Sequence, residues 1–258
     1  EFLLLYFASL ITGIVIVPIN PDLSPVEINY IIENCQAKQI YYQNDLKKKI
    51  DKALIHQKKN IASFPVDAFV NFNVNQFGNE ELPLSKIPKI KGIDNAVIIY
   101  TSGTTGNPKG VLLSQLNIIS DAYSISQWFK FSSATRTLCI LPLYHNNGQI
   151  TTLIAPLYEG GSTVIVKGST SILAFWDLVE KYKVTWSSVM ASILSILLSL
   201  KIERKDKTLE AILCGGQVLT SSIQNKFEKR FNVIIYEGYG LTETTSFSCI
   251  NNYPKKDR

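Results

Sequence analysis

The chain has 258 residues and a formal net charge of +5, with 46% hydrophobic and 18% charged residues. This length allows one large or two modest domains with a sizeable core, and the composition is that of an ordinary globular protein. The positive residues of Lys47–Lys59 and Lys201–Lys207 alternate with acidic ones, as on solvated helix faces, so we expect no nucleic-acid partner.

Cysteine and histidine usage argues against a zinc site. The four cysteines are widely separated, form no Cys-x-x-Cys pair, and are accompanied by only two histidines. We expect reduced thiols in a cytoplasmic protein, and the spacing leaves disulfides open.

The stretch from Phe2 to Val17 contains no charged residue. It is shorter than the roughly 20 residues of a membrane-spanning helix and ends at Pro18. No basic segment precedes it, which argues against a signal peptide. We expect a buried helix followed by a strand and no stable membrane insertion, with peripheral membrane contact as the alternative. Because Glu1 replaces an initiating Met, we expect the chain to begin inside a longer protein.

Short β-branched runs then alternate with segments of helical periodicity. The predicted strands are 13–19, 39–42, 96–101, 135–141, 162–166, 184–189, 211–214 and 233–236. The predicted helices are 24–34, 45–56, 115–129, 150–158, 171–181, 191–198 and 221–231. Alternation of this kind predicts an α/β fold with layered, largely parallel sheets flanked by helices. The stretch 66–93 lacks periodicity and predicts a long irregular connection.

Residues 100–110 read Tyr-Thr-Ser-Gly-Thr-Thr-Gly-Asn-Pro-Lys-Gly and follow directly on a predicted buried strand. Glycines let the backbone approach an anion closely, and successive hydroxyl and N–H groups form an anion-binding concavity. Lys109 adds a mobile positive charge suited to a polyphosphate. A surface hairpin turn is the alternative interpretation.

The loop is not a Walker P-loop, because Lys109 is followed by glycine and not by serine or threonine. It resembles the phosphate-loop signature of the adenylate-forming superfamily, which includes acyl-CoA synthetases, luciferase-like enzymes and peptide-synthetase adenylation domains. The resemblance implies that the loop holds the β- and γ-phosphates of ATP through Thr101, Ser102, Gly103, Thr104, Thr105, Gly106 and Lys109.

The segment 236–245 reads Tyr-Glu-Gly-Tyr-Gly-Leu-Thr-Glu-Thr-Thr and resembles the family's Tyr-Gly-x-Thr-Glu motif. The resemblance implies that Tyr239 stacks on adenine, that Gly240 belongs to the nucleotide site, that Thr242 contacts the α-phosphate, and that Glu243 binds Mg²⁺, a cation that prefers carboxylates and phosphate oxygens. Alone, the segment could be a solvated turn.

Two further segments are similar to family motifs. Gly215, Gly216 and Gln217 end a predicted strand, where the family's Gly-Gly-x backbone passes between adenine and the acyl pocket. The segment 141–148 reads Leu-Pro-Leu-Tyr-His-Asn-Asn-Gly, and its likeness to acyl-CoA synthetases implies that His145 lies near the substrate carboxylate. Amino-acid-adenylating domains usually carry Phe-Asp instead, so His145 favours a plain carboxylic acid.

The segments 8–13 and 17–21 also match the family, as structure without chemistry. Two positions depart from its pattern. Gln115 stands where the family often has His, and Gln217 replaces a commoner Ala or Glu.

The resemblance thus implies an ATP-dependent ligase that forms an acyl-AMP from a fatty or other carboxylic acid and then a coenzyme A thioester. Its cofactors would be ATP, Mg²⁺ and coenzyme A, and its catalytic residues Thr242, Glu243, Lys109 and His145. A non-catalytic nucleotide- or acyl-binding remnant and an amino-acid-adenylating domain are the alternatives.

The resemblance also implies the domain organisation. We expect an N-terminal βα subdomain over 1–92 and a nucleotide-binding α/β subdomain over 93–258. The ribose-binding aspartate and the lysine-bearing small C-terminal domain would follow Arg258, so this chain alone should be weakly active or inactive. We expect the loop after Tyr100 to face the corner at 239–243. The oligomeric state is not predicted.

Overall fold

A computed structural model of the chain describes residues 1–55, 57, 60–66, 84–102, 106–166, 172–205 and 207–254. The chain forms two compact units, residues 1–115 and 116–258. This division falls later than the predicted boundary at 92/93, because a hairpin that begins at Asn95 pairs through Val97 with Ile16 of the first unit.

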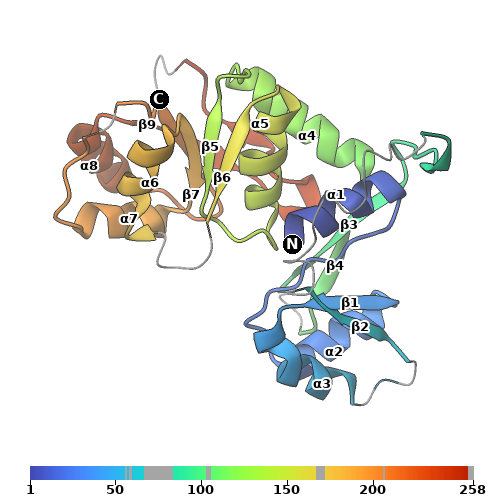
Figure 1. Cartoon of the computed structure of the whole chain (residues 1–258). Helices are drawn as coiled ribbons and strands as arrows, with labels where there is room; N and C mark the ends of the chain where they lie inside the picture. Colours follow the sequence, from blue (N-terminus) through green and yellow to red (C-terminus); the bar gives the residue numbers. More distant parts are fainter. Residues whose placement is uncertain are drawn as a thin grey trace. The chain divides into compact units, whose positions relative to one another are not determined.

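In the first unit, a small parallel sheet lies over two helices (Figure 1). Strands β1 (Gln39–Tyr42) and β2 (Ala62–Pro65) pair in parallel and accompany helices α2 (Pro25–Asn34) and α3 (Lys47–Leu54). Helix α2 begins with a capping box, in which Ser24 N donates to Glu27 at 2.8 Å and Glu27 N donates to Ser24 Oγ at 3.3 Å. Ile28, Ile32 and Ile40 form the core between these elements.

The uncharged N-terminal stretch forms helix α1 (Phe2–Thr12), which ends at Gly13 with a φ of 72°. The prediction of a buried helix is wrong for most of its surface, because Tyr6 is its one fully buried residue, whereas Leu4 is 67% and Ile11 52% exposed. The predicted strand 13–19 is reduced to one bridge between Ile16 and Val97. Among the described helices, none combines the length and apolarity of a membrane span.

The predicted strand before the glycine-rich loop is β3 (Asn95–Thr101), and it pairs with an unpredicted strand, β4 (Lys109–Ser114). The pair is antiparallel and places Thr101 opposite Lys109. In the predicted irregular connection 66–93, residues 67–83 lie outside the described residues. The part after them contains a short 3₁₀ turn, Leu84–Lys86.

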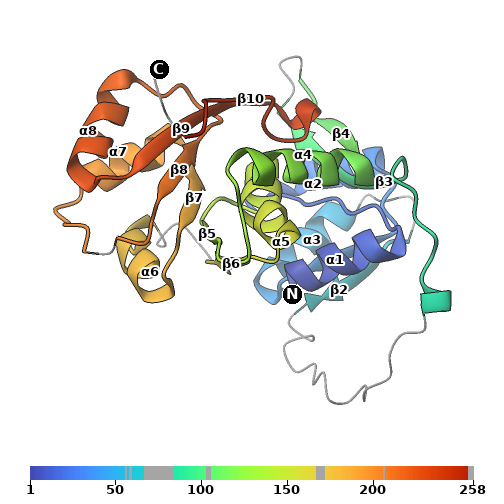
Figure 2. The ribbon, with the colours of Figure 1, turned by 90° about the horizontal axis from the view of Figure 1, so that it is seen from above.

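The second unit confirms the predicted layered α/β fold. Its sheet has the order β10-β9-β8-β7-β5-β6 and is parallel except for β10. The strands are β5 (Arg136–Cys139), β6 (Ser162–Ile165), β7 (Trp186–Val189), β8 (Ala211–Cys214), β9 (Ile234–Tyr239) and β10 (Cys249–Ile250). Helices α6 (Phe175–Tyr182), α7 (Ala191–Ser199) and α8 (Ser221–Phe231) lie on one side of this sheet, and α4 (Gln115–Trp128) and α5 (Ala155–Tyr158) on the other (Figures 1 and 2).

The two faces of this sheet are buried differently. One face joins Leu138, Ile212 and Ile235 to helices α6–α8 in a hydrophobic core. The opposite face carries a group of stacked and edge-on rings: Phe129, Phe131, Trp186, Tyr236 and Tyr253. Each fully buried ring contributes about 1.5–3 kcal/mol by leaving water. Both faces are therefore covered, as in parallel sheets generally.

The predicted helix 150–158 is in fact a π-helix, η5 (Asn147–Ile154), followed by the short α5. Its residues from Gly148 to Ile154 are buried. A Cβ at Gly148 would stand 2.8 Å from the Pro142 carbonyl oxygen, so glycine is needed for this close approach. π-Helical turns occur often at functional sites.

Candidate functional site

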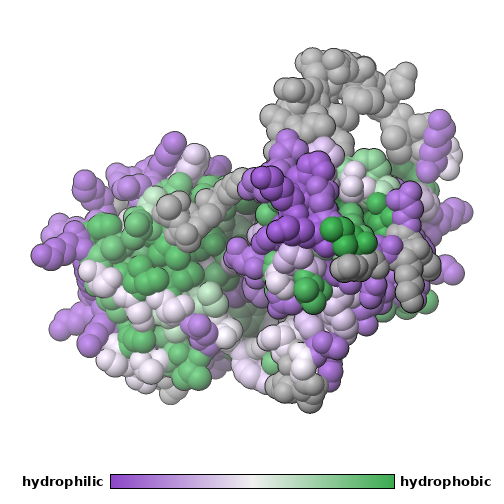
Figure 3. Space-filling view, turned by 90° about the horizontal axis from the view of Figure 1, so that it is seen from below, coloured by the Kyte–Doolittle hydropathy of each residue, from purple (hydrophilic) through white to green (hydrophobic). Residues whose placement is uncertain are grey.

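Three of the predicted site segments follow parallel strands of the second unit. His145 lies in the loop after β5, Gly215–Gln217 follow β8, and Gly240–Glu243 follow β9. Because parallel strands end at one edge of a sheet, these segments share the edge at which open α/β sheets bind ligands. The first residues after β5, β6 and β7 are the partly buried Ile140, Val166 and Met190, and hydrophobic residues gather on this unit in Figure 3.

The glycines of two motifs let one aromatic side chain lie against the strand ends. A Cβ at Gly215 would stand 2.5 Å from a ring carbon of Phe247 and 2.9 Å from the Gly238 carbonyl oxygen. A Cβ at Gly240 would overlap the Ser246 carbonyl oxygen. Packing therefore requires glycine at 215, 238 and 240. Gly216 differs, because its φ is 77° and no atom lies within 4 Å of its Cβ position.

The predicted phosphate and metal residues Thr242 and Glu243 lie in a tight, strained turn. Thr242–Thr244 form a 3₁₀ turn, followed by Thr245 with a φ of 73° and a ψ of −59°. Ser246 N donates to the Thr244 carbonyl at 3.0 Å, which makes Thr245 the centre of a γ-turn of the strained, positive-φ kind. A β-branched residue at positive φ is a conformational outlier, and such strain clusters at functional sites.

Side chains from the π-helix segment contact this turn. Asn146 Nδ2 donates to the Thr245 carbonyl oxygen and, at 3.4 Å, to the Thr242 carbonyl oxygen. The hydroxyls of Thr151 and Ser246 lie 3.3 Å apart. The loop that carries His145 is thereby joined to the turn that carries Thr242 and Glu243.

Asp121 of α4 contacts the residue that follows the turn. Its carboxylate accepts a hydrogen bond from the Phe247 N–H, and its Oδ2 is buried without a partner among the described residues. Burial raises the pKa of Asp121 to about 7. The group can therefore change its charge near neutral pH.

His145 is an exposed residue whose ring packs against that of Tyr144, with ring centroids 4.7 Å apart. Its backbone N–H donates to the Pro142 carbonyl at 3.1 Å. The protein atoms around the ring exclude water and lower the pKa of His145. A neutral imidazole is therefore favoured at neutral pH.

Tyr239, the last residue of β9, is 63% exposed. Gln217 has a structural contact, because its Oε1 accepts a hydrogen bond from Ser192 N at 3.2 Å. Helix α7 has no side-chain cap from its own N-cap residue, Met190. Gln217 therefore satisfies one of the free N–H groups at the start of α7.

The glycine-rich loop joins the two strands of the β3–β4 hairpin in the first unit. Thr101 and Lys109 pair at its base, where Thr101 Oγ1 lies 3.5 Å from the Lys109 carbonyl oxygen. Ser102 and Gly106 are exposed, and Gly106 has a φ of 119°. The predicted phosphate residues Gly103, Thr104 and Thr105 lie outside the described residues.

The other departure from the family pattern, Gln115, donates from Nε2 to the Leu10 carbonyl at 3.1 Å. It thus binds a carbonyl near the end of α1. The four cysteines are free thiols, and burial raises the pKa of Cys139 to about 11 and that of Cys214 to about 12.

The described residues contain no cluster of three or more Cys, His, Asp or Glu side chains that could hold a metal. Glu243 is exposed and offers a single carboxylate. This donor set fits Mg²⁺, which takes one or two carboxylates and completes its shell with phosphate oxygens and water.

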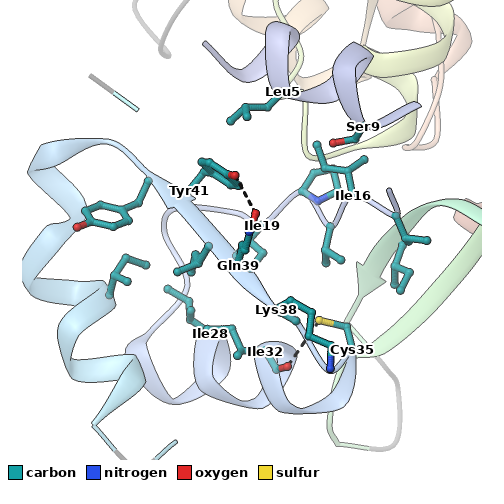
Figure 4. A pocket seen from close by; sticks show the side chains of 18 of the residues that line it. Leu5, Ser9, Ile16, Ile19, Ile28, Ile32, Cys35, Lys38, Gln39 and Tyr41 are labelled. Carbon is teal, nitrogen blue, oxygen red and sulfur yellow. Dashed lines mark hydrogen bonds between the residues drawn. The ribbon is translucent and has the colours of Figure 1, made fainter. Parts of the chain in front are cut away.

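A cavity of about 650 Å³ lies in the first unit, between α1, the segment 14–21, α2 and β1. Figure 4 shows Ile16, Ile19, Ile28 and Ile32 around it, with Tyr41 donating to Gln39 at 2.8 Å. None of the predicted site residues lines this cavity. We therefore do not assign it to the site.

Comparison with known proteins identifies relatives along the whole chain. The family described as AMP-binding enzyme matches residues 1–258. A sulfoacetate–CoA ligase of Cupriavidus necator is 30% identical over 242 residues, which cover 94% of this chain and 47% of the relative. An oxalate–CoA ligase of Saccharomyces cerevisiae is 25% identical over 281 residues, covering 100% of this chain and 52% of the relative. The chain thus spans about half the length of these curated relatives.

Solved structures show the same fold. The inhibitor-bound N-terminal domain of FACL13 from Mycobacterium tuberculosis superposes with a TM-score of 0.84 at 23% identity, covering 99% of this chain and 63% of that one.

Proposed function

Because the chain belongs to the family of AMP-binding enzymes, the adenylate-forming superfamily, we propose that it carries the nucleotide site of an acid–CoA ligase. The ligase would use ATP to convert a carboxylic acid to an acyl-AMP and would then transfer the acyl group to coenzyme A. The observation that carries this proposal is the joining of two segments at one sheet edge: the Asn146 amide binds the turn that contains Thr242 and Glu243, next to His145.

The second unit supplies groups suited to the nucleotide. Tyr239 offers an exposed ring for adenine, and base–aromatic stacking contributes about 1–3 kcal/mol. No atom lies within 4 Å of the Cβ position of Gly216, so a ligand can approach its backbone closely. Thr242 would donate its hydroxyl to the α-phosphate, and Glu243 would hold Mg²⁺ beside the phosphates.

In the proposed reaction, a carboxylate oxygen of the acid attacks the α-phosphorus, and the bond from that phosphorus to the bridging oxygen of the β-phosphate breaks. Pyrophosphate leaves. Catalysis of this kind depends on positioning and charge stabilisation. Lys109 and the hydroxyls of the glycine-rich loop would stabilise the charge on the departing phosphates, and neutral His145 would orient the carboxylate.

We propose that the substrate is a carboxylic acid without an amino group, since His145 stands where amino-acid-adenylating domains usually carry Phe-Asp, in addition to an acidic anchor for the amino group. The relatives above are named for sulfoacetate and oxalate. We therefore extend the proposal from fatty acids to small polar acids.

Calorimetry with ATP–Mg²⁺ tests the nucleotide site. We expect Tyr239→Ala to weaken binding about tenfold or more, from the loss of stacking. Tyr158→Ala is the matched control, because Tyr158 is also exposed, at 47%, and lies on α5 away from the strand ends. Equal affinities of the unchanged chain and both variants would show that adenine does not stack on the Tyr239 ring.

A further inference from the structure

The turn from Thr242 to Ser246 holds the proposed phosphate and metal ligands in a conformation that the backbone does not favour. Its own hydrogen bonds include Leu241 N to Thr244 Oγ1 at 2.9 Å, Thr245 N to the Thr242 carbonyl at 3.1 Å and Ser246 N to the Thr244 carbonyl at 3.0 Å. Thr245 remains at a φ of 73°. Residues in such regions cost about 1–3 kcal/mol and persist only when surrounding structure determines them. Contacts from outside the turn must therefore hold it.

Asn146 supplies those contacts. Its side chain is buried, with 6% exposed, and its Nδ2 donates to the carbonyl oxygens of both Thr242 and Thr245. The amide orientation follows from these partners, because a carbonyl oxygen can only accept a hydrogen bond. Its Oδ1 is left buried without a partner among the described residues. An amide kept for stability alone would gain from satisfying both ends, since an unpaired buried acceptor costs about 1–3 kcal/mol.

The two bonded carbonyls bracket Glu243. Thr242 lies on one side of it and Thr245 beyond the 3₁₀ turn on the other, so a donor that binds both carbonyls fixes the backbone from which the Thr242 hydroxyl and the Glu243 carboxylate project. The next residue along the chain from His145 is Asn146. The Asn146 amide therefore fixes the position of the Thr242–Thr245 turn relative to the loop that carries His145.

We infer that Asn146 is a positioning residue, which holds the Thr242–Thr245 turn in the geometry that binds the α-phosphate and Mg²⁺. This role rests on the proposed function, because it needs a nucleotide at the turn. Asn146 does not itself touch the nucleotide.

The test compares Asn146→Leu with Asn147→Leu. Both replace an amide by an apolar side chain of similar size, and both remove an Oδ1 that is buried without a partner among the described residues. Only Asn146 has hydrogen bonds to the turn among those observed in the described chain. Two quantities are compared on the full 258-residue chain: the affinity for ATP–Mg²⁺ and amide hydrogen exchange in a peptide that spans residues 242–247. The unfolding midpoint in urea checks that each variant is folded.

For Asn146→Leu we expect faster exchange of the Thr245 and Ser246 amides, which are bonded within the turn. We also expect an affinity loss of about tenfold or more, because small displacements of positioned groups cost up to about a hundredfold. Asn147→Leu should change neither quantity. Asn146→Asp, which keeps the size but loses the donor at neutral pH, should behave as Asn146→Leu does.

Three results would overturn the inference. The first is unchanged affinity despite faster exchange in the turn, which would leave Asn146 a structural tether only. The second is equal affinity loss in both leucine variants. The third is a failure of the unchanged chain to bind ATP–Mg²⁺, which removes the proposed function as well; hydrogen exchange would then still report whether Asn146 holds the turn.

Discussion

The ring of Phe247 lies against the backbone of Gly215, so closely that a Cβ at Gly215 would stand 2.5 Å from one ring carbon and 2.8 Å from another. Phe247 follows the strained turn, and Gly215 follows β8 as the first residue of the Gly-Gly segment. The contact therefore joins the two glycine-containing motifs of the second unit through packing.

We predict that Gly215→Ala lowers the free energy of unfolding by about 1–3 kcal/mol, the usual cost of overpacking. Gly216→Ala has open space around its Cβ and should cost only the strain of its positive φ, about 1–2 kcal/mol. Urea unfolding measures both. In a Phe247→Ala background the cost of Gly215→Ala should shrink but persist, because the Gly238 carbonyl oxygen remains 2.9 Å from the new methyl group. An unchanged cost in that background would mean that Phe247 does not occupy this space.

Asp121 should make the stability of the chain fall as the pH rises. Its pKa is raised from 3.8 to about 7, so the folded chain binds more protons than the unfolded chain between about pH 4 and pH 7. Asp121 therefore leaves the free energy of unfolding unchanged below pH 4 and lowers it above pH 7.

We expect Asp121→Asn to raise the free energy of unfolding at pH 8 by up to about 4 kcal/mol, at about 1.4 kcal/mol per pKa unit, with little effect at pH 4. The asparagine Oδ1 can still accept from the Phe247 N–H. Urea unfolding at both pH values checks this, with the exposed Asp22→Asn as a charge-matched control. The same gain at pH 4 and pH 8 would contradict a raised pKa.

His145 should make the stability of the chain fall as the pH falls, the opposite of the effect of Asp121. Because its pKa is lowered by burial, the unfolded chain binds more protons than the folded chain just below its ordinary pKa of about 6.5. Stability is therefore lost as the pH falls through this range. In a proton NMR titration we expect one imidazole to titrate below pH 6.5 and to disappear in His145→Gln, with His56→Gln identifying the other. Titration of the His145 ring above pH 6.5 would show that the charged form is stabilised instead.

Gln217 is predicted to act as a helix cap. Gln217→Ala removes the acceptor for Ser192 N and should cost about 0.5–1 kcal/mol, at the low end for an N-terminal cap. Gln217→Glu keeps an acceptor oxygen and adds a negative charge at a helix N-terminus, which is favourable. Thermal unfolding of the three proteins should therefore rank alanine lowest, and a stability of Gln217→Ala equal to that of the unchanged chain would exclude the cap.

The sequence predicts regular elements well where periodicity and burial agree. Strands 39–42 and 211–214 and helix 221–231 match the structure residue for residue. Strand β4 was not predicted because its first residues, Lys109 and Gly110, end the glycine-rich motif, which predicts a loop. The π-helix was predicted as an α-helix because the sequence pattern does not distinguish the two kinds of helix.

The candidate site divides in the same way. The sequence singles out Thr242 and Glu243 through a motif, and their roles in binding stay predictions. Asn146, Asp121 and Phe247 could not be singled out in this way, because each acts through a contact distant in the sequence: Asn146 binds Thr245, and Asp121 binds the Phe247 N–H. The sequence places Asn146 next to His145 of the motif, but its burial and its contact with Thr245 appear only in the structure.

We propose that this chain binds a nucleoside triphosphate with its phosphate tail at the loop ending in Lys109. Calorimetry with ATP–Mg²⁺ and with AMP on the unchanged chain, Lys109→Ala and the control Lys130→Ala examines this binding. We predict that Lys109→Ala weakens ATP binding about tenfold, equivalent to about 1.4 kcal/mol, and leaves AMP binding unchanged, because AMP lacks the β- and γ-phosphates. Equal affinities of Lys109→Ala and the unchanged chain for ATP, or no binding of ATP by the unchanged chain, would contradict the account.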